Sequence, residues 1–256
     1  MARLKNKVAL ITGATGGIGE ATAKLFLSEG ANVMLVGRSE QKLHETRDRL
    51  GGGDALAMAV AEAADEAAIK AAVAMTLKRF DRLDILFANA GTEGDLKPIA
   101  DLTVEEFQAV LTTNIIGVWL SMKHCEAPLK ASGKGSIIAT SSIAGAIGFP
   151  NMSPYIASKH AVCGLVKTAA LEYGPANIRV NAVAPGPIDN RMMASLGAQL
   201  APEAAGALRT QVEQSTALKR YGTNEEVANL TLFLASDEAS YCTGGYYLVD
   251  GGFVAA

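Results

Sequence analysis

The amino-acid sequence predicts an α/β fold in which helices cover both faces of a parallel sheet. Short apolar segments of strand length alternate along the chain with longer segments of helical periodicity, which is the pattern of repeated βαβ units. A glycine-rich turn directly follows the first apolar segment. Of the 256 residues, 49% are hydrophobic and only 19% are charged, so the chain can bury a large core. Together these features predict a doubly wound, Rossmann-type sheet.

Seven apolar segments have the length of strands. They alternate with helical segments, so each consecutive pair of strands is expected to be parallel and joined by a crossover helix. The predicted strands are residues 8–12, 32–36, 55–60, 85–88, 136–140, 179–183 and 246–249.

A helix is predicted directly after the glycine-rich turn. Its apolar face is expected to contain Ile18, Ala21, Leu25 and Phe26, which recur at helical spacing. Gly30 suits the left-handed position that follows a helix, so the helix should end just before it.

Two longer helices are predicted in the second half of the chain. One begins near Thr103, where Thr103 and Glu106 have the spacing of a capping box, and continues through Lys123. The other covers about 154–173 and stops before the Gly174-Pro175 pair.

The chain is expected to form one domain covering residues 1–256. Its length alone fits one large domain or two small ones, but no linker, repeat or change of composition divides it. The stretch at about 190–216 lacks strand character and is long for a plain connection, so we expect a substrate-loop insertion there. Its apolar residues either line a pocket beneath a lid or form the inner face of a helix; they are Met192, Met193, Leu196 and Leu200.

Composition argues against several kinds of partner and ligand. The formal net charge is −3 and no Lys/Arg cluster occurs, which argues against nucleic acid. No apolar run approaches the ~20 residues of a membrane span, and no cleavable signal is evident, so we expect a cytoplasmic protein without membrane contact. Cys125, Cys163 and Cys242 are expected to be reduced thiols, and the three histidines have no metal-binding spacing. The low charge suggests that a subunit interface hides additional surface.

The glycine-rich turn predicts a nucleotide site. Where a strand ends and a helix begins, missing Cβ atoms let phosphate oxygens approach the backbone, and the helix start favours an anion. A plain strand-to-helix turn would also explain some of these glycines. The expected cofactor-binding residues of this turn are Gly13, Thr15, Gly17, Ile18 and Gly19.

The residues after the second strand predict NADP(H) rather than NAD(H). Dinucleotide proteins that prefer NAD usually place a carboxylate there for the ribose hydroxyls, whereas this chain has Gly37, Arg38 and Ser39. A guanidinium can pair with the 2′-phosphate of NADP. The alternative is that Arg38 is a solvated residue and the protein uses NAD.

Tyr155 and Lys159 predict acid–base chemistry. They are four residues apart in a predicted helix, so their side chains share one face. A neighbouring ammonium is expected to lower the pKa of a phenol towards the range of a general acid or base. Ser142 stands just past the strand at 136–140, at the edge where parallel sheets present catalytic groups.

Because of these residues, the chain resembles a classical short-chain dehydrogenase/reductase over essentially its whole length. Among the members of this family, it resembles in particular the carbonyl reductases and the 3-oxoacyl-carrier-protein reductases. The resemblance implies a homotetramer that packs the helices at about 103–123 and 154–173 across an interface. The matching residues are Thr12, Gly13, Gly17, Ile18, Gly19, Asn89, Ala90, Gly91, Asn114, Ser142, Tyr155, Lys159, Asn181, Pro185, Gly186 and 249–252.

The resemblance also implies a role for each catalytic residue. Tyr155 would protonate a carbonyl oxygen in reduction or take a hydroxyl proton in oxidation, and Ser142 would hold that oxygen. Lys159 would lower the pKa of Tyr155 and bind the nicotinamide ribose. Asn114 would position a water that links Lys159 to solvent. Hydride transfer itself belongs to the nicotinamide.

Two further turns would position the cofactor in such a protein, although glycine and proline also serve as plain turn formers. The first is the turn Asn89, Ala90 and Gly91; the second contains Pro185, Gly186 and Ile188. Three positions depart from the family pattern: Ala88 replaces an asparagine, Glu62 stands where an aspartate would contact adenine, and Asn190 stands for a threonine.

The sequence therefore predicts an NADP(H)-dependent oxidoreductase that interconverts a ketone and a secondary alcohol. The substrate is a small ketone or a 3-oxoacyl thioester; only Arg191 and Lys130 are candidates to meet an acyl carrier. Two alternatives are kept. One is an NAD-preferring alcohol dehydrogenase, and the other is a nucleotide-binding regulator without turnover, which would be expected to lack one of the chemical groups.

Overall fold

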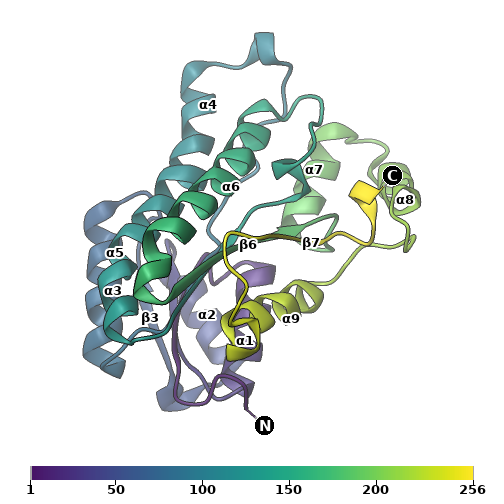
Figure 1. Ribbon diagram of the computed structural model, residues 1–256. Helices are drawn as coiled ribbons and strands as arrows, with labels where there is room; N and C mark the ends of the chain where they lie inside the picture. Colours follow the sequence, from purple (N-terminus) through teal and green to yellow (C-terminus); the bar gives the residue numbers. More distant parts are fainter. Residues whose placement is uncertain (1, 256) are drawn as a thin grey trace.

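Residues 2–255 are described by a computed structural model (Figure 1). Its centre is a seven-stranded sheet in the order β3-β2-β1-β4-β5-β6-β7, and every neighbouring pair is parallel. The strands are β1 (Val8–Thr12), β2 (Asn32–Gly37), β3 (Leu56–Val60), β4 (Ile85–Ala88), β5 (Gly135–Thr140), β6 (Ile178–Pro185) and β7 (Tyr246–Val249). The predicted doubly wound fold is confirmed, and each predicted strand corresponds to an observed one.

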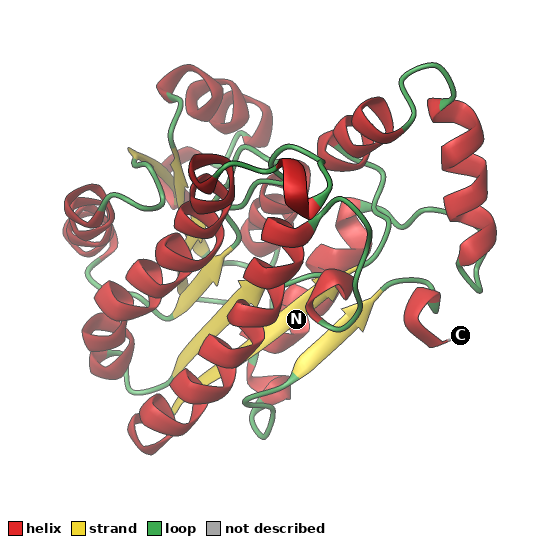
Figure 2. Cartoon of the chain, turned by 90° about the horizontal axis from the view of Figure 1, so that it is seen from above, coloured by secondary structure: helices red, strands yellow, loops and turns green. Residues whose placement is uncertain are grey.

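Helices cover both faces of this sheet (Figure 2). The apolar residues of α1, α2 and α9 pack on one face, and those of α3, α5 and α6 pack on the other. The helices are α1 (Gly17–Ser28), α2 (Glu40–Leu50), α3 (Glu66–Phe80), α4 (Val104–Leu111), α5 (Gly117–Ala131), α6 (Ser153–Tyr173), α7 (Arg191–Leu200), α8 (Ala205–Ser215) and α9 (Asn224–Ala235). No helix within residues 2–255 is long and apolar enough to cross a membrane.

The chain reverses its winding direction between β1 and β4. Strands β1 to β3 extend the sheet to one side, and β4 to β7 extend it to the other. The crossover loops at the carboxyl ends of β1 and β4 therefore diverge and leave a crevice, where doubly wound sheets bind their ligands. The sheet order thus fixes the place of the site.

The helix predicted from Thr103 through Lys123 is interrupted. The predicted capping box of Thr103 and Glu106 is present and starts α4. A π-helical turn, Thr112–Ile116, then separates α4 from α5. Such turns occur frequently at functional sites, and this one contains the predicted site residue Asn114.

The stretch at about 190–216 forms two helices, α7 and α8. The Asn190 side chain caps α7 by accepting hydrogen bonds from the N–H groups of Met192 and Met193, at 3.0 and 3.3 Å. Neither helix contains a fully buried residue, because both lie beyond the sheet, near the C-terminal end of the chain (Figure 1).

Candidate active site

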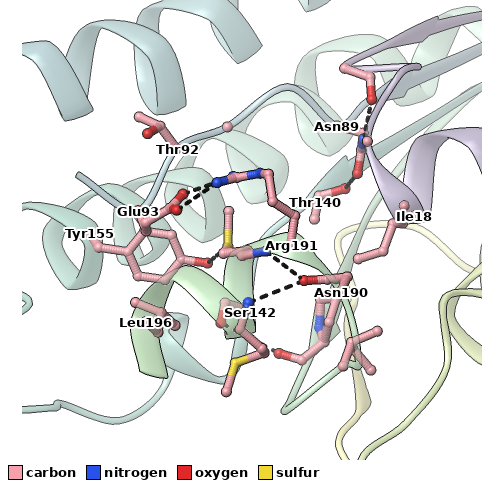
Figure 3. Close-up of a pocket in the computed structure, with 18 of the residues that line it drawn as sticks. Ile18, Asn89, Thr92, Glu93, Thr140, Ser142, Tyr155, Asn190, Arg191 and Leu196 are labelled. Carbon is pink, nitrogen blue, oxygen red and sulfur yellow. Dashed lines mark hydrogen bonds and ion pairs between the residues drawn. The ribbon is translucent and has the colours of Figure 1, made fainter. Parts of the chain in front are cut away.

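A cavity of about 1020 Å³ opens along the carboxyl edge of the sheet, from the start of α1 to α7 and α8 (Figure 3). It joins segments that are far apart in the sequence. The predicted site residues that line it are Gly13, Thr15, Gly17, Ile18, Arg38, Ser39, Asn89, Ala90, Gly91, Ser142, Tyr155, Lys159, Pro185, Gly186 and Ile188. Gly19 and Asn114 stand behind this lining and support it.

Two glycines of the turn between β1 and α1 have no space for a side chain. Gly13 has a φ of +63°, and a Cβ there would lie 2.8 Å from the Cα of Ala90. A Cβ on Gly19 would lie 2.4 Å from the carbonyl oxygen of Gly13. These positions require glycine because the turn packs directly against the 89–91 turn and against itself.

The start of α1 fits an anionic ligand. Its N-cap residue, Gly16, makes no side-chain hydrogen bond to the helix, so the first backbone N–H groups of α1 keep their donor capacity. The positive end of the helix dipole adds to this capacity. The turn therefore suits the pyrophosphate of a dinucleotide.

The 89–91 turn is tied to the glycine turn through Asn89. The Nδ2 of Asn89 donates to the carbonyl oxygen of Gly13 at 3.2 Å, and its Oδ1 accepts from the Thr140 hydroxyl at 3.0 Å. The Thr12 hydroxyl accepts from the N–H groups of Asn89 and Ala90. One amide side chain therefore joins β1, β4 and β5 at the crevice, although Ala88 replaces its customary partner.

Basic and hydroxyl groups occupy the end of the cavity beyond β2. Arg38 is exposed and lines the cavity, and Ser39 caps α2 by accepting from the N–H of Lys42 at 3.3 Å. Lys42 also lines the cavity. Lys42 was not predicted as a site residue, although its position in the first turn of α2, three residues after the cap, could have identified it.

Tyr155 lies in the first turn of α6 and lines the cavity. Tyr155 is only 7% exposed, and this burial raises its pKa to about 12. The Glu93 charge also raises this pKa, whereas a hydrogen bond with Ser142 lowers it. The hydroxyl donates to the Met192 sulfur at 3.8 Å. The phenol is therefore protonated across the neutral pH range.

Lys159 reaches the cavity one turn further along α6. Its ammonium donates to the carbonyl oxygen of Thr140 at 2.8 Å and lies 5.5 Å from the centroid of the Tyr155 ring. Burial lowers the pKa of Lys159 to about 8. In this conformation burial determines the direction of the Tyr155 pKa shift, and the Lys159 ammonium is directed at the Thr140 carbonyl; the lowering of the phenol pKa by Lys159 stays a prediction.

Ser142 and Asn114 approach the same centre from β5 and from the π-helical turn. The Ser142 hydroxyl accepts from the Ala144 N–H at 3.2 Å and donates to the Pro185 carbonyl at 3.4 Å. Asn114 is fully buried; its Nδ2 donates to the Thr92 carbonyl at 2.9 Å and to the Ser158 hydroxyl at 3.0 Å. Asn114 thus fixes the segment that follows the 89–91 turn.

The segment after β6 closes the far side of the crevice. A Cβ on Gly186 would lie 2.7 Å from the backbone of Asp250, so this position also requires glycine. Ile188 is 2% exposed and pairs in a parallel bridge with Gly222. This pairing holds the segment in an extended form along the cavity.

Apolar side chains surround the Tyr155 hydroxyl. Tyr155 clusters with Ala144 and Met152, and Phe149, Met192 and Leu196 pack against them. Both expectations for 190–216 are thus met in part: Met192 and Leu196 belong to the inner face of a helix, and that face lines the cavity.

Two ion pairs in the cavity wall were not predicted. Arg191 holds the Glu93 carboxylate with two hydrogen bonds, of 2.9 and 3.1 Å, and Arg209 holds Asp189 in the same way, at 3.0 and 2.8 Å. Glu93 and Arg191 are 98 residues apart, so no local spacing could have identified them. No group of three His, Cys, Asp or Glu side chains within residues 2–255 could hold a metal ion.

Comparison with known proteins places this geometry in a family. A family model described as enoyl-(acyl carrier protein) reductase matches residues 13–254. The sequence is 38% identical to levodione reductase from Leifsonia aquatica over 257 residues, which is 99% of this chain and 96% of the relative. The chain belongs to the short-chain dehydrogenase/reductase family. As a member of that family it is an NAD(P)-dependent oxidoreductase acting on CH–OH groups.

Other short-chain dehydrogenases/reductases match equally fully. Cyclohexanol dehydrogenase from Acinetobacter sp. (strain SE19) is 39% identical over 98% of this chain and 96% of its own length. A crystal structure of levodione reductase superimposes with a TM-score of 0.96 at 37% identity, covering 99% of this chain and 100% of that structure. The fold is therefore that of this family.

Proposed function

We propose that this short-chain dehydrogenase/reductase interconverts a compact, neutral ketone and its secondary alcohol with NADP(H). The observation that carries the proposal is the group of Ser142, Tyr155 and Lys159 beside an apolar part of the cavity wall. The hydroxyls of Ser142 and Tyr155 line the place where a carbonyl oxygen is proposed to bind, and the apolar wall beside them suits a hydrocarbon ring.

Tyr155 is the proposed general acid in ketone reduction. Its phenol is protonated at neutral pH, because burial raises its pKa to about 12. It can therefore donate a proton to the carbonyl oxygen as that oxygen becomes an alkoxide. The Ser142 hydroxyl holds the same oxygen by a hydrogen bond. In alcohol oxidation Tyr155 takes the hydroxyl proton instead.

Lys159 and Asn114 support this proton transfer in the proposal. A Cβ on Gly91 would lie 3.3 Å from Asn114 Oδ1 and 3.6 Å from Lys159 Nζ, so both groups approach the backbone of the 89–91 turn. Lys159 would bind the nicotinamide ribose and stabilise the phenolate. Asn114 would position a water between Lys159 and solvent.

The cofactor is proposed to occupy the remaining length of the cavity and to supply the hydride when it is bound. The glycine turn, in which Gly13 and Gly19 have no space for a Cβ, would hold its pyrophosphate. Pro185, Gly186 and Ile188 would lie against its nicotinamide end, and the turn Asn89, Ala90 and Gly91 would support its adenosine side. At the adenosine end, Thr15, Arg38 and Ser39 are the proposed contacts, with Arg38 pairing with a 2′-phosphate.

Cofactor preference is tested by steady-state kinetics with NADPH and NADH. We expect NADPH to have the higher kcat/KM, and Arg38→Ala to raise the KM for NADPH at least tenfold with little change for NADH. Arg47→Ala is the matched control, because Arg47 lies on α2, the helix that follows Arg38, and pairs with Asp48 on the surface. An unchanged NADPH KM in Arg38→Ala would overturn the assignment.

Compact ring ketones are proposed as substrates over acyl thioesters. Relatives of 38–39% identity are named for levodione and cyclohexanol. Of the two basic residues considered for an acyl carrier, Arg191 is engaged with Glu93. Lys130 is near the end of α5, which returns to the start of β5, and so lies at the edge opposite the cavity.

A substrate panel followed by cofactor absorbance tests this function. Cyclohexanone and its alkyl derivatives are expected to be reduced with NADPH at a kcat/KM at least tenfold above that for a 3-oxoacyl thioester. A higher kcat/KM for the thioester would instead identify the protein as a 3-oxoacyl thioester reductase. NADPH binding without turnover of any ketone would favour a nucleotide-binding regulator.

The proposed assembly is a homotetramer. Large apolar side chains are exposed on α4, on the π-helical turn and on the helices after it, including Val104 (65%), Trp119 (43%) and Leu171 (80%). Their burial between subunits would account for the low charge content. We also propose a cytoplasmic location, supported by cysteines that form no disulfide within residues 2–255.

A further inference from the structure

One buried carboxylate in the cavity wall has no part in the proposed chemistry. We propose that Glu93, held by Arg191, makes the substrate pocket selective for neutral molecules and excludes those that carry a carboxylate. This inference rests on the proposed function and names a feature of its substrate class. Glu93 and Arg191 are then specificity-determining residues, and neither is required for proton transfer.

Glu93 is buried and firmly placed. Its side chain is 6% exposed, and both of its oxygens accept hydrogen bonds from Arg191. Burial alone would raise the pKa of Glu93, but the hydrogen bonds from Arg191, its own backbone and Ser195, together with the Arg191 charge, lower it below its ordinary value. The carboxylate is therefore negatively charged at neutral pH.

This negative charge lies at the reacting end of the cavity. Glu93 and Tyr155 both line the cavity, and Figure 3 shows the carboxylate close to the phenol ring. Consistent with that placement, the Glu93 charge contributes to the raised pKa of Tyr155. A substrate whose carbonyl oxygen meets Tyr155 therefore lies in the part of the cavity that Glu93 also lines.

The rest of the substrate end is electrically balanced. Asp189 and Arg209 also line the cavity and also neutralise each other. Among the described lining residues of this end, Lys159 is the remaining charge, and it is directed at the Thr140 carbonyl. A carboxylated substrate would therefore find a nearby like charge and no unengaged cation beside the apolar wall.

Arg191 cannot serve as the receptor for such an anion while Glu93 is ionised. Two of its nitrogens already donate to Glu93. A substrate carboxylate that displaced Glu93 would leave a buried charge without its partner, which is strongly unfavourable. Two carboxylates about 6 Å apart, at an effective dielectric constant of about 20, disfavour binding by about 100-fold; the partial compensation by Arg191 reduces the expected effect to about tenfold.

The test compares two substrates of similar size, 4-oxocyclohexanecarboxylate and its methyl ester. With the wild-type enzyme and NADPH, kcat/KM for the ester is expected to exceed that for the acid at least tenfold. Glu93→Gln removes the negative charge and frees the Arg191 guanidinium. This variant should reduce the ester preference at least tenfold, mainly by a lower KM for the acid.

Two further variants identify the cause. Glu93→Gln/Arg191→Gln should keep the part of the gain for the acid that comes from removing the Glu93 charge and lose the part that comes from the freed guanidinium, so its ester-to-acid ratio should lie between those of the wild type and Glu93→Gln. Glu213→Gln is the matched control: Glu213 pairs with Arg209 at 3.1 Å and is absent from the described cavity lining. It makes the same charge change on α8 and should leave the ester-to-acid ratio unchanged. Thermal melting of each variant checks that it is folded.

The inference is overturned if the wild type uses acid and ester equally well, or if Glu93→Gln leaves their ratio unchanged. Failure of the proposed function has a different signature, which is no turnover of the ester or of cyclohexanone. In that case calorimetric binding of cyclohexanecarboxylate and its methyl ester to the NADPH-saturated wild type and Glu93→Gln decides the question. Tighter binding of the ester only while Glu93 is present supports the inference, and equal binding to both proteins refutes it.

Discussion

Tyr155 and Lys159 show how burial sets the charge of a side chain before any ligand binds. The pKa of each group is shifted so that the neutral form is favoured. The pKa of the phenol is raised to about 12, and that of the ammonium is lowered to about 8. Desolvation is the first cause in each case. The site is therefore prepared to donate a proton from Tyr155 at neutral pH.

Replacing Tyr155 with phenylalanine removes the proposed acid and keeps the ring. We expect kcat for ketone reduction to fall by about 10³-fold, with a melting temperature close to that of the wild type, because the ring retains its packing with Ala144 and Met152. Tyr173→Phe, at the end of the same helix, is the control and should keep full activity. Turnover by Tyr155→Phe at more than a tenth of the wild-type rate would exclude this mechanism.

The pH dependence should differ between the two directions. Oxidation needs the phenolate, and the pKa of Tyr155 is about 12, so kcat/KM for alcohol oxidation should rise by up to about tenfold per pH unit above neutrality. Ketone reduction needs the phenol, so its kcat/KM should stay level until Lys159, with a pKa of about 8, loses its charge. Above that pH, kcat/KM for reduction should fall.

Lys159→Met identifies the group behind the fall in reduction. The variant has no charge to lose, so its lower rate should stay level through pH 8. Initial rates in buffers of constant ionic strength give both profiles. A wild-type reduction rate that increases above pH 8 would contradict the assignment.

Residues close in sequence were predictable, and residues joined only by the fold were not. The four-residue spacing of Tyr155 and Lys159 and the position of Ser142 after a strand are local patterns, and the structure brings these groups together as the sequence suggested. Glu93 and Arg191 meet across 98 residues through α7, whose path depends on the whole sheet. The direction in which the pKa of Tyr155 shifts also could not be predicted from the sequence, because burial is a property of the folded chain.

At the scale of elements, α9 supports the nucleotide turn from outside. Residues of α1 and α9 pack in one cluster on the same face of the sheet, and a Cβ on Gly17 would lie 2.7 Å from the Asn224 side chain at the start of α9. The first turn of α9 carries a capping box of Thr223 and Glu226. The spacing of this capping box is a sequence signal from which the start of α9 could have been predicted.

Gly17→Ala tests this contact. We expect the added methyl group to displace Asn224, lowering stability by about 1 kcal/mol and weakening NADPH binding several-fold. Because the clash is with the end of a side chain, Gly17→Ala/Asn224→Ala should recover most of the stability. Gly174→Ala is the control, since no atom lies within 4 Å of its Cβ position. Denaturant unfolding and NADPH titration give both quantities; an unaffected single variant would show that the contact is unimportant.

The helix between Thr103 and Lys123 illustrates a different limit of sequence reading. Its start is correctly marked by the capping box, and its residues have helical periodicity throughout. The π-helical turn around Asn114 arises because the buried amide must reach both the Thr92 backbone and Ser158. Such a register change satisfies long-range contacts and leaves no local signature.

At the scale of the whole molecule, the exposed apolar side chains of the second half predict self-association. Light scattering is expected to give four times the chain mass of 26.5 kDa. Ile116→Glu places a charge at an apolar side chain that is 43% exposed on the π-helical turn, and should shift the protein to smaller species. Met75→Glu, on α3 and 47% exposed, is the control and should not change the mass. A monomeric wild type would refute the assembly.

The two helices α7 and α8 have no fully buried residue, and neither of the two clusters that fill the faces of the sheet includes a buried residue from them. They nevertheless supply Met192, Leu196 and Arg191 to the wall around the proposed substrate. Substitutions in this segment can therefore change which compounds are accepted while costing the fold little. Directed evolution of new substrate ranges should accumulate its changes there, and stabilising changes should come from elsewhere in the chain.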